Sequence, residues 1–197
     1  MKRLSIAFLL MLAASVAAFA QLGEIWVSGG GASTRDNSLG SLDPAAGSAA
    51  ELTYHTGFRL EARLTLNNES HFGHEFGYAY TKGNVDLGSV NYFGMSTHQG
   101  MYNFLLYGTS EGAPIRPFAT GGVHFSSFYP PGASPLSGNG VTKFGFNYGG
   151  GVKVRVGSMY SVRFDVRDYW QGKPDFGLNP EGKLKILVVS AGFGLVF

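Results

Sequence analysis

The chain has 197 residues, of which 14% are charged and 14% aromatic, and its formal net charge is +2. Soluble domains carry about a quarter charged residues, so this composition argues against a surface that faces water throughout. The lack of any cysteine excludes a small secreted fold held by disulfides and a lipid anchor on a terminal cysteine. With 30 glycines, the composition suits a β protein that presents apolar side chains to something other than water.

The first 20 residues have the pattern of a secretory signal peptide. Lys2 and Arg3 precede an apolar run that is shorter than the roughly 20 residues of a membrane-spanning helix, and the small-residue signature "AFA" predicts cleavage after Ala20. Removing these two cations from the 15 basic residues leaves 13 basic and 13 acidic residues, so no nucleic-acid partner is expected. We predict a cleaved leader over 1–20 and one domain over 21–197.

Polar and apolar residues alternate with a period of two in eight segments of the remaining chain, which is the pattern of half-buried β-strands. Tight turns at Asn67-Asn68 and Gly157-Ser158 join two pairs of these segments into hairpins. The predicted strands cover residues 22–32, 52–66, 70–82, 91–107, 115–128, 143–156, 160–170 and 184–197.

The connections between these strands alternate in length. Long segments fall at 33–51, 83–89, 129–140 and 172–182, whereas of the three intervening connections, Asn67-Asn68, 108–114 and Gly157-Ser158, the first and the last are tight turns. An even strand count with long loops at one end and tight turns at the other is typical of outer-membrane barrels. Such a sheet closes on itself because each backbone group without a hydrogen-bond partner in hydrocarbon costs several kcal/mol. We therefore predict an all-β, eight-stranded, antiparallel up-and-down transmembrane barrel with four long extracellular loops and periplasmic termini.

Charged residues gather on one face of the predicted strands. In "GFRLEARLTL", Arg59, Glu61 and Arg63 alternate with apolar residues, and in a membrane barrel this charged face points inward. Because an eight-stranded barrel is only just wide enough for its own side chains, we predict a packed polar network without a wide pore. Its predicted members are Arg59, Glu61, Arg63, Glu75, Lys153, Arg155, Arg163, Asp165 and Arg167.

Aromatic residues on the apolar face fall near the strand ends, as in the two interfacial girdles of membrane barrels. The alternation over 52–66 puts Leu52 and Tyr54 on the same, lipid-facing side as Phe58. The predicted girdle consists of Tyr54, Tyr80 and Trp170 toward the loops, and of Phe72, Tyr160 and Phe197 toward the turns.

The C-terminal octet "SAGFGLVF" resembles the terminal β-signal of outer-membrane proteins, with matching positions at Ser190, Gly192, Phe193, Leu195 and Phe197. Together with the blocks "GHEFGYAY", "RPFATGGVHF" and "VRFDVRDYW", it makes the domain similar to the small OmpA/OmpX-like outer-membrane barrels. This resemblance implies a place in the outer membrane of a Gram-negative cell. It also implies outer-membrane lipid, periplasmic chaperones and the barrel-assembly machinery as partners.

Two groups of residues suggest a catalytic or metal site, but each lacks a residue that such a site needs. His124 and Ser126 share a strand face, as in the His-x-Ser pair of lipid A deacylases, yet no carboxylate is near in sequence to orient the histidine. His71 and His74 point to opposite faces of a strand, and a site of His71 with His55 lacks further ligands. The sequence therefore predicts no catalytic residue, no metal ligand and no cofactor.

The interpretation with most support is a non-enzymatic outer-membrane barrel with a structural or surface-interaction role. Two alternatives stay open: a lipid A deacylase-like enzyme on the same barrel, and a secreted lipocalin-like carrier of a hydrophobic ligand. The carrier would need its apolar face inward and a charged outer wall. The sequence leaves the extracellular ligand unknown.

Overall fold

The computed structural model of the chain describes residues 22–68, 71–137, 139–178 and 180–197. The predicted leader over 1–20 lies outside this part. In the described residues, no helix has the length and hydropathy needed to cross a membrane. A short 3₁₀ segment, η1 (Pro44–Ala50), is the helical element of the described chain.

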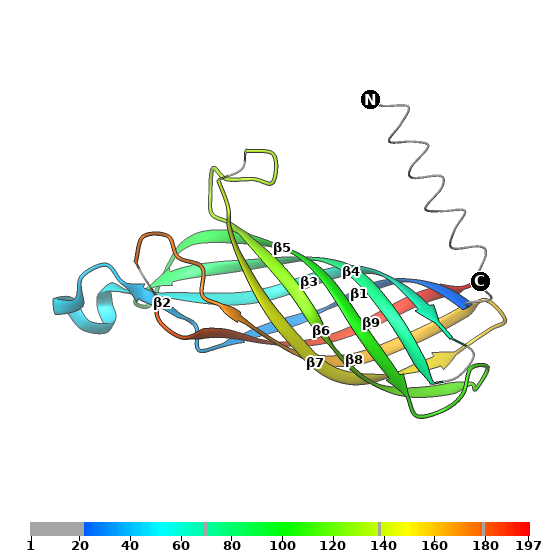
Figure 1. Cartoon of the computed structure of the whole chain (residues 1–197). Coiled ribbons are helices and arrows are strands. Elements are labelled where there is room, and N and C mark those ends of the chain that lie inside the picture. Colours follow the sequence, from blue (N-terminus) through cyan, green and yellow to red (C-terminus); the bar gives the residue numbers. More distant parts are fainter. Residues whose placement is uncertain (1–21, 69–70, 138, 179) are drawn as a thin grey trace.

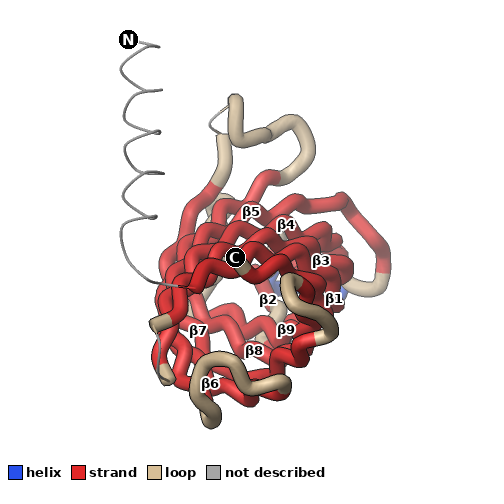
Figure 2. Tube along the Cα trace, turned by 90° about the vertical axis from the view of Figure 1, so that its right-hand side faces the viewer, coloured by secondary structure: helices blue, strands red, loops and turns tan. Residues whose placement is uncertain are grey.

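Eight strands form one closed antiparallel barrel (Figures 1 and 2). Each strand pairs with its neighbours in the chain, and β1 closes the ring by pairing with both β3 and β9. The wall consists of β1 (Leu22–Arg35), β3 (Glu51–Asn67), β4 (Phe72–Leu87), β5 (Val90–Tyr107), β6 (Ile115–Tyr129), β7 (Val141–Arg155), β8 (Tyr160–Gly172) and β9 (Lys183–Val196). A four-residue strand, β2 (Ser38–Ser41), extends the edge of β3. The predicted fold class and strand count are confirmed.

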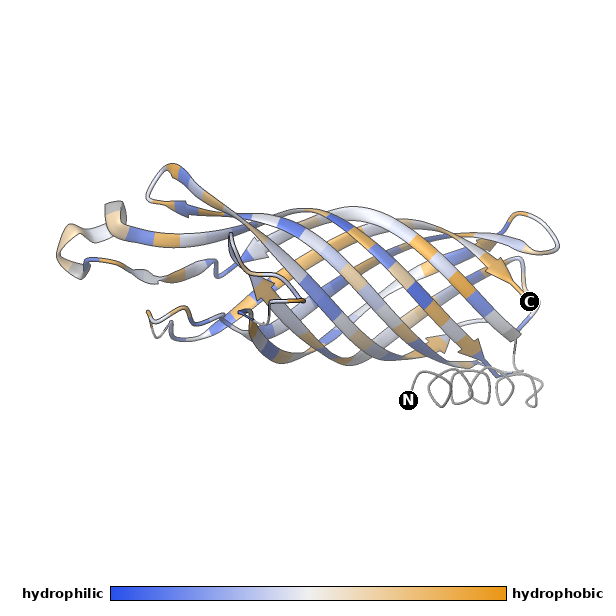
Figure 3. Ribbon diagram, turned by 90° about the horizontal axis from the view of Figure 1, so that it is seen from above, coloured by the Kyte–Doolittle hydropathy of each residue, from blue (hydrophilic) through white to orange (hydrophobic). Residues whose placement is uncertain are grey.

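Hydrophilic and hydrophobic residues alternate along the strands (Figure 3), and the polarity of the barrel is opposite to that of a water-soluble one. Val27, Val123 and Phe164 are 63%, 59% and 55% exposed on the outer wall, whereas Arg163 and Arg167 are fully buried inside. Every second residue along a strand points to the same face, so the alternation in the sequence becomes an apolar wall around a polar centre. The carrier alternative needs the opposite arrangement and is wrong.

The two ends of the barrel differ (Figure 1). At the turn end, the strands are joined by residues 68–71, 108–114 and 156–159, and the C terminus lies there as well. At the loop end, the long connections are 36–50, 130–140 and 173–182.

The prediction of a long loop over 83–89 is wrong. β4 and β5 continue as a paired hairpin to Leu87 and Val90, and Gly88 and Ser89 alone connect them. Gly88 has a φ of 59°, a left-handed conformation that lets two residues reverse the chain. The loop end therefore carries three long loops and one extended hairpin rather than four loops.

A β-bulge in β3 reverses part of the predicted alternation. Thr56 pairs with Gly83 but Arg59 pairs with Thr81, so Gly57 and Phe58 together oppose one residue of β4. The extra residue switches the faces beyond it. Leu52 and Tyr54, predicted to face lipid, instead lie inside, and Tyr54 is fully buried.

The interior at the loop end is apolar. A cluster of inward side chains from several strands fills it, together with Leu39 of β2 and the half-buried Leu178 of the 173–182 loop. Within the cluster, the Tyr54 hydroxyl bonds Thr97 at 2.8 Å and its ring packs edge-on against Phe128 at 5.9 Å. The lumen is thus closed by packed side chains above its charged centre.

Candidate functional site: the ion-paired interior

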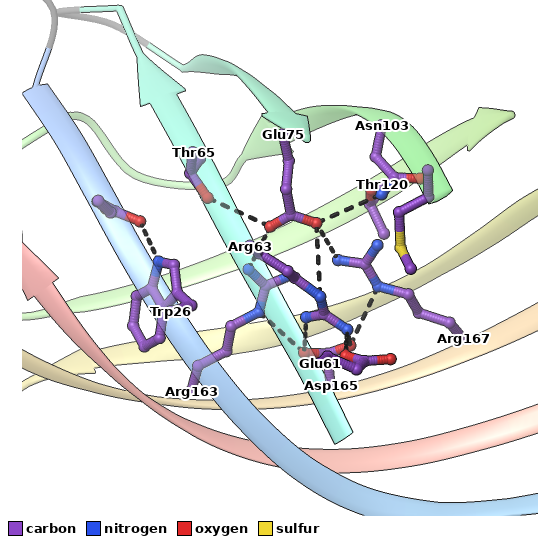
Figure 4. A network of polar contacts seen from close by, with 12 residues as sticks. Trp26, Glu61, Arg63, Thr65, Glu75, Asn103, Thr120, Arg163, Asp165 and Arg167 are labelled. Atoms are coloured by element: carbon purple, nitrogen blue, oxygen red, sulfur yellow. Dashed lines mark hydrogen bonds and ion pairs between the residues drawn. The ribbon is translucent and has the colours of Figure 1, made fainter. Parts of the chain in front are cut away.

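The centre of the lumen holds a cluster of four arginines and three carboxylates, and Figure 4 labels all of them except Arg59. Three strands supply them at alternate positions, so their side chains all project inward. All seven are buried. The cluster consists of Arg59, Glu61 and Arg63 of β3, Glu75 of β4, and Arg163, Asp165 and Arg167 of β8.

Two carboxylates, Glu75 and Asp165, are shared between arginines. Arg163 donates from Nη1 to Glu75 Oε2 at 2.5 Å and from Nε to Asp165 Oδ2 at 2.8 Å. Arg167 donates from Nη2 to Glu75 Oε1 at 2.7 Å and from Nε to Asp165 Oδ1 at 3.1 Å. Arg63 adds a bond from Nη1 to Asp165 Oδ2 at 2.9 Å. These contacts link strands on opposite sides of the lumen.

The third carboxylate, Glu61, accepts bonds from both of its strand neighbours, Arg59 and Arg63. Arg59 also donates to Gln99 and, at 3.1 Å, to the hydroxyl of Thr81. Its guanidinium lies 4.9 Å above the ring of Tyr169, a cation–π contact that stabilises a charge away from water. The guanidinium thereby joins the charged centre to the apolar cluster at the loop end.

A second polar group closes the turn end of the lumen. Lys153 donates to Glu24 and, at 2.7 Å, to the hydroxyl of Tyr107. Asn67 and Trp26 each donate to Glu24 at 2.8 Å. The sequence could have predicted this group, because Glu24, Trp26 and Ser28 alternate with Ile25 and Val27. In a closed barrel the apolar Ile25 and Val27 face lipid, so Glu24 faces the interior.

Arg116 and Glu111, which were not predicted from the sequence, form an ion pair beside this group. Arg116 pairs with Glu111 and lies 3.7 Å above the ring of Tyr107. Arg155 at the end of β7 was predicted to be inside but is only partly buried. Its Nη2 lies 3.6 Å from Glu111 Oε1. The predicted interior set is therefore buried except for Arg155.

The filled lumen determines what the interior can do. Removing a charge from water is costly unless its partners compensate for the lost hydration. In the centre, Arg63, Glu75 and Asp165 each have more than one oppositely charged partner. Together with the apolar side chains at the loop end, these groups pack the interior of the described barrel.

His124 and Ser126 share a strand face, as the sequence predicts, and both lie inside the barrel. His124 Nε2 lies 3.0 Å from Gln171 Oε1, and Ser126 accepts a bond from Gln99 at 2.9 Å. In the described part of the chain, no carboxylate forms an ion pair with His124. The described residues do not supply the orienting acid of a triad, and the intervening Phe125 lies on the outer wall.

The described residues contain no group of three His, Cys, Asp or Glu side chains that would hold a metal ion. His55 pairs across the strands with Asn84 near the loop end, whereas His71 precedes β4 at the turn end. The two histidines considered together from the sequence are therefore on opposite ends of the barrel.

The other predicted residues lie on the outer wall or in the last strand. Phe72 and Tyr160 are exposed near the turn end, and Tyr80 and Trp170 are partly exposed nearer the loops. Of the C-terminal residues, Phe193, Leu195 and Phe197 point outward, whereas Ser190 is buried and Gly192 packs against Ser28.

An apolar outer wall, a closed ring and a charged, ion-paired centre define the class of transmembrane β-barrels. The chain belongs to the family described as outer membrane protein beta-barrel domain, whose model matches residues 6–197. It is an outer-membrane barrel protein. A search of curated proteins finds no match.

Solved structures share the fold at low sequence identity. Neisserial surface protein A is 14% identical, with 89% of this chain and 97% of that chain covered and a TM-score of 0.58. OprG from Pseudomonas aeruginosa is 19% identical, with 90% and 97% covered and a TM-score of 0.56. Ail of Yersinia pestis, solved with the heparin analogue sucrose octasulfate, is 10% identical, with 91% and 100% covered and a TM-score of 0.53. At these identities the comparison concerns the fold alone.

Proposed function

We propose that this protein is a non-enzymatic barrel of the outer membrane that makes contacts outside the cell through its loop end. The single observation that carries the proposal is the contrast between a filled lumen and an elaborated loop end. Ion-paired side chains occupy the centre and apolar side chains the loop end of the lumen, while three long connections leave the barrel on that side. Because the interior is packed, we expect the loops at this end of the barrel to make the contacts with other molecules.

The orientation in the proposal has the loops outside and both chain ends in the periplasm. Short turns on the periplasmic side and longer loops on the outer side are the rule for bacterial barrels. Ail was solved in complex with the heparin analogue sucrose octasulfate, which supports the idea that a barrel of this fold provides a binding surface.

The absence of cysteine makes the orientation directly testable. Ser137→Cys in the 130–140 loop should react with a membrane-impermeant maleimide on intact cells, because that loop is outside. Ser158→Cys, the matched change in the turn between β7 and β8, should react only after the outer membrane is permeabilised. Labelling in the reverse order would contradict the proposal, and labelling of neither site on intact or opened cells would show that these segments are covered.

We also propose that the last strand is the segment that the assembly machinery and periplasmic chaperones recognise. Phe197 exchanges two 2.9 Å backbone hydrogen bonds with Gly23 and so forms part of the seam at which the ring closes. Phe197 is 60% exposed, on the outer wall. A residue that is accessible before closure and paired afterwards suits recognition of the unassembled chain.

A further inference from the structure

A basic pocket lies on the outer side of the barrel at the loop end. It has a volume of about 480 Å³ and is lined by Lys173, Lys183, Lys185 and Trp170 together with residues of the β1–β2 turn. This size is typical of sites for small molecules or headgroups. Lys185 and Trp170 are direct partners across β8 and β9, and Lys183 pairs with Gly172.

The pocket marks the point where the apolar wall ends. Along the outward face of β9, Leu195, Phe193, Val189 and Leu187 are followed by Lys185 and then Lys183. On β8, the outward Trp170 packs against the exposed ring of Phe146 at 5.7 Å. Tryptophan and lysine beyond an apolar band are the residues that membrane proteins place at the boundary with water.

Cationic charge exceeds anionic charge in this pocket. Three lysines and one carboxylate, Asp36, line it. Lys185 bonds Asp36 at 2.8 Å and lies 4.7 Å above the Trp170 ring. The hydrogen bond from Lys185 also holds the pKa of the Asp36 carboxyl below its usual range, which favours the charged form of Asp36.

The other two lysines have no such partner. Among the residues that the structure describes, neither Lys173 nor Lys183 has a carboxylate oxygen within 4.0 Å. The Lys183 ammonium lies 5.8 Å above the ring of Phe146 instead. Two ammonium groups beside an aromatic ring and an apolar wall are therefore available to an anion.

We infer that this pocket binds the phosphate groups of a phosphorylated sugar headgroup on a lipid whose acyl chains lie against β8 and β9. The inference rests on the proposed orientation, which puts the pocket at the outer leaflet. Phosphate complements the two unpaired lysines, and the polar side chains of Asn37 and Ser38 in the lining suit sugar hydroxyls. The apolar wall directly below favours an amphiphile over a free anion.

The test uses the refolded barrel in detergent, titrated with lipid A that carries its phosphates and followed by native mass spectrometry. Basic residues near a membrane surface contribute about 1 kcal/mol each to the attraction of anionic lipid, or about fivefold in affinity. Lys183→Gln should therefore weaken binding about fivefold, and Lys173→Gln with Lys183→Gln about 25-fold if the two act independently. Heat-dependent gel mobility verifies that each variant is folded.

Lys82→Gln is the matched control, because Lys82 is an exposed outward lysine near the loop end of a distant strand, β4. It should leave the affinity within about twofold, and dephosphorylated lipid A should bind at least tenfold more weakly. Equal losses for Lys82→Gln and Lys183→Gln, or equal binding of dephosphorylated lipid, would overturn the inference. Displacement of the lipid by millimolar inorganic phosphate would also overturn it, in favour of a free-anion site. Binding in detergent does not depend on how the barrel is oriented in a membrane. A failure of lipid binding is therefore distinguishable from a failure of the proposed orientation, which the cysteine-labelling test on cells measures.

Discussion

Glu75→Gln should destabilise the barrel by about 3 to 5 kcal/mol, the cost of leaving a buried ion-pair partner uncompensated. Glu75 accepts bonds from Arg163 and Arg167, and Arg63 lies 4.0 Å away. The amide has almost the same shape but no charge, so the loss reports electrostatics rather than a cavity. Urea unfolding of the protein in phospholipid vesicles, followed by the gel mobility of the folded barrel, measures the change.

Glu181→Gln is the control for this prediction. Glu181 is exposed in the 173–182 loop, and its neutralisation should change stability by less than about 0.5 kcal/mol. Combining Glu75→Gln with Arg163→Gln should cost less than the sum of the single changes, because the pair is removed together. Equal stability of the Glu75 and Glu181 variants would mean that water reaches the central arginines.

Val123→Arg should cost about 2 to 4 kcal/mol, because it puts a guanidinium on the lipid-facing wall near the middle of β6. Val123 is 59% exposed and lies between Tyr102 and Phe146 on the neighbouring strands. The same vesicle unfolding experiment measures the effect.

Val90→Arg makes the same chemical change at the tip of the β4–β5 hairpin, where Val90 is 67% exposed beside the Gly88-Ser89 turn. Beyond the apolar band this change should cost about 0 to 1 kcal/mol. If both variants were equally stable, the outer wall at Val123 would not be facing hydrocarbon.

The period-two pattern was enough to predict the fold, because in an antiparallel barrel the alternation and the turns determine both the strands and their faces. It predicted that Arg59, Glu61 and Arg63 point inward. It failed at Tyr54, since the bulge at Gly57 and Phe58 adds a single residue that no local composition marks. It failed at 83–89 because a hairpin that extends beyond the barrel contains the same Gly, Asn and Asp residues as a loop.

The partners of the charged residues were beyond sequence reasoning for a different reason. Arg63 contacts Asp165, which is 102 residues away, and Lys153 contacts Glu24, which is 129 residues away. These pairs depend on the tilt and stagger of the closed sheet, which set the height of each side chain in the lumen. Alternation gives the face of a residue but not its height.

The ring of strands has a consequence for how the chain acquires its structure. Glu75 on β4 and its partners on β8 have three strands between them along either direction around the ring. A partly built sheet cannot bring them together, so Glu75 lacks Arg163 and Arg167, while these two arginines keep only Asp165 of their own strand. We therefore expect half-closed states to be high in energy, with the closure of β1 on β3 and β9 coupled to the pairing of charges across the lumen.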